Sequence, residues 1–253
     1  RHLQAQRRSG TDFFAPLRTH AWAIVGLGLL GYVIYQVAFI LGVSLTTAGS
    51  AALIMASAPL MTALMSQLLR YDRLHWLGWM GLLLSLAGTV LVVLYSPRAL
   101  DFSRQALQGN LLMMGASVAW GAYTALSQPL VRKIDPSSLT FLSLLPAYPV
   151  LLILGILFFD TVTWSAVDGR AWAAIIFSGA LSTGLTLALW NQAVRHVGPA
   201  HTAAFGNLTP FVALVAGHLL LNEPITFAQI LGGVLILGGL LLMRRTRRLP
   251  PAT

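Results

Sequence analysis

A stretch of sequence that occurs twice, 151 residues apart, constrains the fold of this chain more than any other feature. Residues 50–93 and 201–244 align without a gap. The matching positions include one proline and two glycines: Pro59 with Pro210, Gly81 with Gly232, and Gly88 with Gly239. Proline and glycine each have a specific backbone consequence, so these pairs carry more weight than matching leucines. The likeness continues back to residue 21, and a repeat this long predicts a duplicated membrane domain.

The composition identifies the class of protein. Hydrophobic residues make up 57% of the 253 residues and charged residues only 9%, which is typical of an integral membrane protein. The formal charge of +9 would suggest nucleic acid in a soluble chain, but here the basic residues stand at the ends of apolar runs. We interpret them as topology signals. We therefore expect an all-helical membrane protein with no nucleic-acid partner, no cofactor and no metal.

Eight apolar runs approach the roughly 20 residues that a helix needs to cross the hydrocarbon core. We expect spans at 21–43, 47–69, 76–95, 110–130, 138–159, 171–192, 199–221 and 226–243. The chain then divides into a basic cytoplasmic connector, an incomplete first repeat of three spans, an external loop, a second repeat of five spans and a basic cytoplasmic tail: 1–20, 21–95, 96–109, 110–243 and 244–253.

The basic residues predict the orientation of these spans. Of the 16 Lys and Arg, only Arg98, Arg104 and Arg170 fall on one side when alternate loops are compared. The other side carries the remaining basic residues and both termini, and the positive-inside rule places it in the cytoplasm. We expect the protein to lie in the cell inner membrane. The loop 70–75 is then inside and its repeat partner 221–226 is outside. We therefore expect the two copies to be inverted in the membrane.

The inversion also predicts the size of the repeat unit. Inverted copies need an odd number of spans between equivalent helices, and five spans separate the second from the seventh. The unit is thus expected to hold five helices, complete in the second copy and lacking its first two in the first. Because two helices are missing, one alternative is that the chain is a fragment that does not transport.

Four segments in a fixed order carry a resemblance to a known family. They are GNLLMMGASVAWGAYTALSQPLVRK at 109–133, LWNQAVRHVGPAHTA at 189–203, and the pair AAxxxxxxPLxxALxxxLLRYDRL at 51–74 and TAAFGNLTPFVALVAGHLLLNEPIT at 202–226. With two inverted five-helix units, the chain resembles the EamA-like permeases of the drug/metabolite transporter superfamily. The resemblance implies a ten-helix fold, of which two helices are absent here, and export of amino acids or related metabolites.

Two prolines at corresponding positions predict interrupted helices. Pro59 removes the backbone bond to the Met55 carbonyl, and Pro210 removes the bond to the Gly206 carbonyl. Interrupted helices at matching positions of inverted halves point to a transport site near the midplane. The alternative is a packing kink without ligand contact.

Polar and aromatic side chains form stripes on several of the expected spans. Hydrocarbon offers no partner for hydroxyl or amide groups, so these faces are expected to point into the bundle or a wet cavity. Hydrogen bonds that simply join helices are the alternative for any one residue. The candidate substrate-binding residues are Tyr32, Tyr35, Gln36, Trp120, Tyr123, Thr186, Trp190, Asn191 and Asn207.

All seven acidic residues lie in loops or at span ends, so no carboxylate is expected at mid-membrane for proton coupling. A membrane-embedded lipid-modifying enzyme, the rival from another class, would need a cluster of acids, histidines or a metal at the interface. No such motif is found in the sequence. We predict a permease, not an enzyme, that exports a small metabolite such as an amino acid by alternating access. Its other partner is the lipid bilayer, and its oligomeric state stays open.

Overall fold

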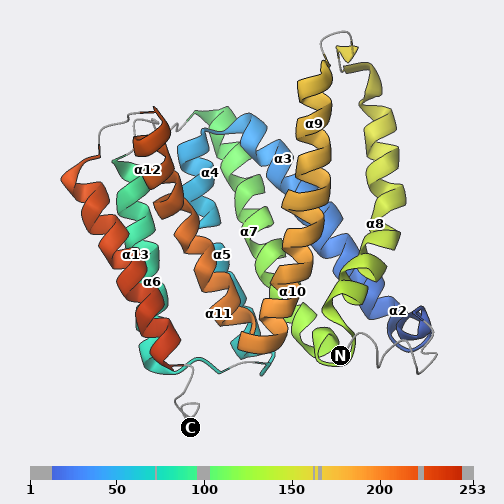
Figure 1. Ribbon diagram of the computed structural model, residues 1–253, viewed down its shortest axis with the longest axis horizontal. Coiled ribbons are helices and arrows are strands. Elements are labelled where there is room, and N and C mark those ends of the chain that lie inside the picture. The colour runs from blue at the N-terminus through green and yellow to red at the C-terminus, as the bar shows by residue number, and fades with distance from the viewer. Residues whose placement is uncertain are drawn as a thin grey trace.

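The computed structural model describes residues 13–71, 73–95, 103–161, 163–164, 167–221 and 225–246, with the backbone alone at 180–183, 217 and 220–221. The regular elements of these residues are helical (Figure 1). In chain order they are α2 (Ala15–Gly28), η1 (Leu29–Ile34), α3 (Tyr35–Leu45), α4 (Ala48–Met55), α5 (Ala58–Leu68), α6 (Trp76–Leu94), α7 (Arg104–Val131), α8 (Pro136–Leu157), η2 (Phe159–Thr161), α9 (Gly169–Phe177), η4 (Ser178–Leu185), α10 (Thr186–Val197), α11 (Pro199–Ala204), η5 (Phe205–Asn207), α12 (Leu208–Leu221) and α13 (Phe227–Thr246).

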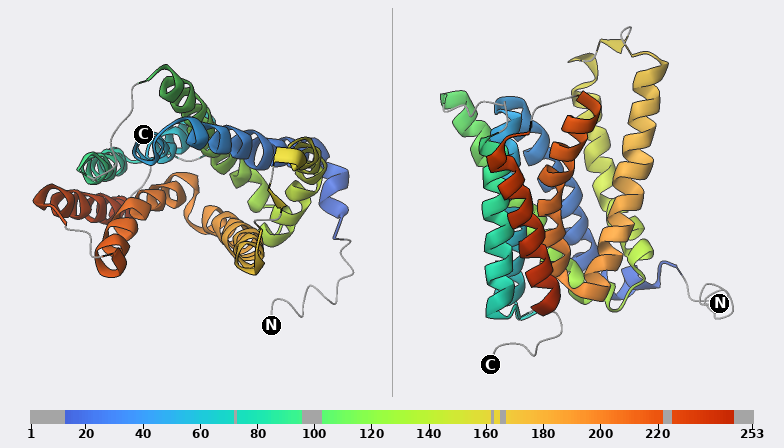
Figure 2. Two further views of the ribbon diagram at one scale, coloured as in Figure 1. Left: turned by 90° about the horizontal axis from the view of Figure 1, so that it is seen from above. Right: turned by 60° about the vertical axis from the view of Figure 1, so that its left-hand side comes forward.

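The helices stand side by side in one bundle, with α6 and α13 at one edge and α8 and α9 at the opposite edge (Figures 1 and 2). We call the end where α4 begins the upper end, and the end where α13 finishes the lower end (Figure 1). Four helices have an arginine at or just after their lower ends: Arg70, Arg132, Arg195 and Arg244. By contrast, Arg104 is the first residue of α7, which begins at the upper end. The described basic residues are therefore concentrated at the lower end.

Side-chain caps fix where several helices begin. The side chains of Thr47 and Ser103 accept hydrogen bonds from backbone N–H groups three residues ahead, at the starts of α4 and α7. Asp135 accepts from the N–H groups of Ser137 and Ser138 at the start of α8. Because Ser103 is the cap, α7 begins at Arg104, inside the segment expected to be an external loop.

The helix α2 also begins earlier than the sequence suggested. It starts at Ala15, with Pro16 in its first turn, and so includes the last residues of the expected connector. Proline suits a first helical turn because the missing N–H would have no partner there.

The two copies of the repeat share their irregular segments. A π-helical turn at Leu29–Ile34 separates α2 from α3, and another at Ser178–Leu185 separates α9 from α10. The 151-residue shift places the first of these within the second. Likewise α4 and α5 are separated at residues 56–57, and α11 and α12 are separated by the 3₁₀ turn Phe205–Asn207. Equivalent sequence therefore adopts equivalent departures from the α-helix.

The last helices of the two copies, α6 and α13, pack through glycines. Gly81 lies against Gly239, and Gly88 lies against Gly232. A Cβ added to Gly88 would come within 2.7 Å of the Ile236 nitrogen, so no larger residue fits without a shift. Later residues of α6 contact earlier residues of α13, so the two helices are antiparallel.

Five helical stretches of the described residues are long and apolar enough to cross a membrane: Ala15–Leu45, Ala48–Leu68, Trp76–Leu94, Pro136–Leu157 and Phe227–Thr246. The remaining three expected spans are also helical, as α7, as α9 with η4 and α10, and as α11 with η5 and α12. The chain is thus a multi-pass helical membrane protein.

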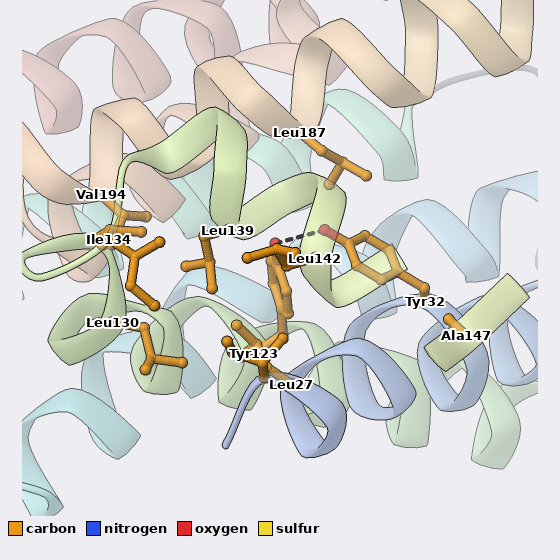
Figure 3. Close-up of a cluster of buried hydrophobic side chains, with 12 residues drawn as sticks. Leu27, Tyr32, Tyr123, Leu130, Ile134, Leu139, Leu142, Ala147, Leu187 and Val194 are labelled. Carbon is orange, nitrogen blue, oxygen red and sulfur yellow. Dashed lines mark hydrogen bonds between the residues drawn. The ribbon is translucent and has the colours of Figure 1, made fainter. Parts of the chain in front are cut away.

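Two clusters of buried side chains fill the bundle. One joins α2, α7, α8 and α10 around Tyr123 and Leu139 (Figure 3). The other joins α5, α6, α11 and α13 around Leu82 and Ile236 and also includes Ala63, Ala200 and Met243. Leu82, Ala200 and Met243 of this second cluster lie towards the lower end, below the cavity described next, whereas Val92 stands near the upper end of α6 and lines that cavity.

Candidate functional site

A cavity of about 520 Å³ lies between the two copies of the repeat, a size that suits a small-molecule ligand. Its lining begins at Ala48, Gly49 and Gln229 near the upper end and reaches down to Trp120 and Trp190. The described residues that line it include no Asp, Glu, Lys or Arg. The site is therefore an uncharged cavity that extends from the middle of the bundle towards its upper end.

The floor and one wall of the cavity are aromatic. The ring of Trp120 lies 4.9 Å from that of Tyr35 and 5.3 Å from that of Trp190, centroid to centroid. Phe39 packs 5.7 Å from Tyr35 and also lines the cavity. The Trp190 indole N–H donates to the Thr124 hydroxyl, which orients this ring. Aromatic faces arranged in this way can stack on a planar group or attract a cation.

Both helix interruptions border the cavity. Met55, Ala56 and Pro59 line it from the first copy, and Gly206 and Pro210 line it from the second. Pro59 stands in the first turn of α5, after the two-residue break. The interrupted segments that the prolines predict therefore face one another across the same space.

Asn207 is one of the most deeply buried polar side chains at this site, with 1% solvent exposure. Its amide nitrogen donates to the Ser85 hydroxyl at 3.0 Å, and that hydroxyl in turn donates to the Leu82 carbonyl. The amide oxygen of Asn207 has no hydrogen-bond partner within the structure. A buried acceptor without a partner is costly, and in native proteins it calls for an explanation.

A second group of polar side chains lies beneath the aromatic floor, outside the cavity. The Tyr32 hydroxyl is 3.1 Å from that of Tyr123 (Figure 3), and the Asn191 amide nitrogen donates to the Tyr123 hydroxyl at 3.0 Å. The same nitrogen donates to Thr140 at 2.9 Å, and Ser143 donates to Tyr32. These bonds connect η1, α7, α8 and α10 in one buried network. Trp120 stacks on Tyr123 and so separates the network from the cavity.

The structure distributes the candidate residues over three environments. Tyr35, Trp120, Trp190 and Asn207 line the cavity, together with Pro59 and Pro210. Tyr32, Tyr123 and Asn191 belong instead to the buried network. Gln36 is half-buried and Thr186 is exposed, and neither lines the cavity.

Sequence reasoning missed several polar residues of the site. Ser85 holds Asn207, and Thr140 and Ser143 complete the buried network. Each is a single small hydroxyl residue in an apolar helix, a pattern that gives no periodic signal. Their role depends on which helices lie beside them.

The chain is similar to known transporters over most of its length. Residues 7–94 and 107–245 match the model of the EamA-like transporter family. The uncharacterized transporter YyaM of Bacillus subtilis is 26% identical over 234 residues, which cover 92% of this chain and 76% of YyaM. A WAT1-related protein of Arabidopsis thaliana is 25% identical over 244 residues, which cover 86% of this chain and 66% of the plant protein.

The fold is also found in a solved structure. A crystal structure that is 21% identical in sequence matches 99% of this chain with a TM-score of 0.80 and has 84% of its own length covered. At this identity the likeness concerns the fold alone. Taken with the family match over both halves, it leads to one conclusion: the chain belongs to the EamA-like transporter family and is a membrane transporter.

Proposed function

We propose that this protein exports small metabolites such as amino acids, and that its substrate passes through the cavity between the repeats. The observation that carries the proposal is the origin of the lining. Six pairs of lining residues are related by the 151-residue shift: Phe39 and Trp190, Ala52 and Ala203, Met55 and Gly206, Ala56 and Asn207, Ala58 and Thr209, and Pro59 and Pro210. The cavity is thus formed where equivalent segments of the two copies face each other, as expected for a transport site between repeats.

The glycine contacts support an inverted arrangement of the copies. The 151-residue shift pairs Gly81 with Gly232 and Gly88 with Gly239. If each glycine is replaced by its equivalent in the other copy, the contact between Gly81 and Gly239 becomes the contact between Gly232 and Gly88, which is also present. A contact set that maps onto itself in this way is typical of a two-fold axis. Because α6 and α13 are antiparallel, such an axis would lie across the helices, in the plane of the membrane. We propose eight crossings arranged around it.

The charges support one orientation of the bundle. Arg70, Arg132, Arg195 and Arg244 lie at or just beyond the lower ends of their helices. The positive-inside rule then places the lower end, with both termini, in the cytoplasm, and we propose the cell inner membrane as the location. The cavity extends upwards, and Leu82 and Met243 of the second buried cluster pack below it, an arrangement that fits an outward-facing state of an alternating-access cycle.

The lining favours solutes without net charge. A cation or anion left uncompensated in an uncharged cavity is costly. A zwitterion carries its own counter-charge, and the aromatic floor offers surface for its apolar part. Amino acids combine these properties.

Exchange by purified protein tests the proposal. Proteoliposomes loaded with unlabelled L-phenylalanine, L-leucine or L-threonine should accumulate the same labelled amino acid by counterflow. Trp120→Ala, which opens the aromatic floor, should lower the rate, and Trp22→Ala at an exposed position should not. If none of the three amino acids exchanges faster than in protein-free liposomes, the proposed substrate class is wrong.

A further inference from the structure

The unpaired amide oxygen of Asn207 has a fixed orientation. The Ser85 hydroxyl uses its one proton on the Leu82 carbonyl, at 2.9 Å, so it can only accept from Asn207. The amide nitrogen of Asn207 therefore faces Ser85, and the amide oxygen is left without a partner. Ser85 is itself fully buried, in the tightly packed α6 helix. The amide therefore cannot rotate to hide its oxygen without losing the bond to Ser85.

Three other polar groups that line the cavity already have partners within the protein. The Thr89 hydroxyl donates to the Ser85 carbonyl at 3.1 Å. The Gln229 amide oxygen accepts from the N–H and the hydroxyl of Thr226. The Trp190 indole N–H is held by Thr124. The Asn207 oxygen differs from these groups because it is buried without a partner among the described residues, and it differs from the Tyr35 and Thr209 hydroxyls of the same lining because it can only accept.

A donor in the ligand would satisfy this oxygen. Two kinds of donor, a hydroxyl and an ammonium, have the necessary N–H or O–H group. The aromatic rings of Tyr35, Trp120 and Trp190 line the same cavity, and aromatic faces attract a positively charged nitrogen. The described residues of the lining also include no Lys or Arg that would repel one. The combination of an acceptor with aromatic faces favours the ammonium.

We propose that the Asn207 amide oxygen selects substrates with a primary ammonium group, and that Ser85 is the positioning residue that aims it. This inference rests on the proposed function, because it names the group by which an amino acid is recognised. The 151-residue shift relates Asn207 of the second copy to Ala56, and Ser85 of the first copy to Ile236, so the pair occurs once and has no equivalent in the repeat. Recognition is therefore asymmetric, although the cavity is built from equivalent segments.

Binding of three related ligands to the purified full chain in detergent, measured by isothermal titration calorimetry, tests the inference. L-phenylalanine has a primary ammonium, N,N,N-trimethyl-L-phenylalanine keeps the charge but has no N–H, and L-3-phenyllactate replaces the ammonium with a hydroxyl. We expect the wild type to bind L-phenylalanine about tenfold more tightly than either analogue, which is the usual effect of leaving a buried acceptor unpaired.

Four variants separate recognition of the ammonium group from an effect of ligand size. Asn207→Leu removes the acceptor at similar volume and should abolish the preference for the ammonium. Asn207→Asp keeps an oxygen acceptor and should retain it. Ser85→Ala frees the amide to rotate and should weaken it. Asn110→Leu is the matched control, because Asn110 accepts from Thr46 and does not line the cavity, and it should behave as the wild type.

Each other outcome contradicts the inference. If the trimethyl analogue is excluded by size alone, Asn207→Leu will keep the preference. If L-3-phenyllactate binds as tightly as L-phenylalanine, the site selects any donor and not the ammonium. A wild type that binds all three equally, or none, also overturns it. If Asn207→Leu does not fold, two other results test the inference: the wild type must prefer the primary ammonium of L-phenylalanine, and Ser85→Ala must weaken that preference. Binding with the expected preference but without counterflow would instead contradict the proposed function.

Discussion

Gly88 and Gly232 pack backbone against backbone where α6 crosses α13. A second crossing of the same kind joins Gly81 to Gly239. Small residues allow helices in a membrane to approach closely, where van der Waals contact stabilises their association. Because these contacts join the ends of the two copies, they hold together the bundle edge next to the cavity.

Gly88→Ala should therefore destabilise the protein. The new methyl group would meet the Gly232 carbonyl and the Ile236 backbone, which cannot easily move aside, and overpacking of this kind costs about 1 to 3 kcal/mol. Thermal unfolding in detergent measures the change. Gly115→Ala on α7 is the control, because a Cβ there meets nothing within 4 Å, and it should leave stability unchanged or slightly raised. Equal melting temperatures for the two variants would contradict the packing argument.

The buried network should contribute to stability more than to binding. Tyr123→Phe removes the hydroxyl between Tyr32 and Asn191 and leaves the Asn191 amide oxygen without a donor, at a cost of about 1 to 3 kcal/mol. Tyr148→Phe, at a side chain that is 66% exposed, should cost little. Unfolding measurements on both variants test this. A Tyr123→Phe protein of unchanged stability but with lost ligand binding would place Tyr123 in the substrate site instead.

The aromatic floor should act on the Michaelis constant for transport. Trp120→Ala removes the ring between Tyr35 and Trp190, and stacking of this kind is worth about 0.5 to 1.5 kcal/mol. We expect KM for counterflow to rise about three- to tenfold, and Trp120→Phe to recover part of the loss. The same KM for Trp120→Ala and the wild type would show that the floor does not contact the substrate.

The sequence predicted much of the fold because its signals are local. Eight apolar runs became helical stretches, and the breaks beside Pro59 and Pro210 follow from the missing N–H of proline. The family and the membrane class also followed from residue order and composition.

The two π-helical turns explain why the candidate residues do not all lie in one environment. Regular α-helical spacing predicts that Tyr32 and Tyr35, three residues apart, share one helix face. The π turn at Leu29–Ile34 widens the helix between them, and Tyr32 enters the buried network while Tyr35 lines the cavity. Thr186, the shift partner of Tyr35, follows the longer π segment and is exposed. Such turns have no sequence signal as clear as proline.

Protection of a single cysteine tests most directly whether the cavity is the substrate site. The chain contains no cysteine, so Ala52→Cys places one thiol on the cavity wall, and Leu107→Cys places one at an exposed position near the upper end, outside the cavity. A membrane-impermeant thiol reagent is added to right-side-out vesicles with and without saturating L-phenylalanine, and the rate of modification is measured. We predict that the substrate slows modification of Ala52→Cys several-fold and leaves that of Leu107→Cys unchanged. If counterflow proceeds while Ala52→Cys reacts at the same rate with and without substrate, the substrate does not occupy this cavity and the account is wrong.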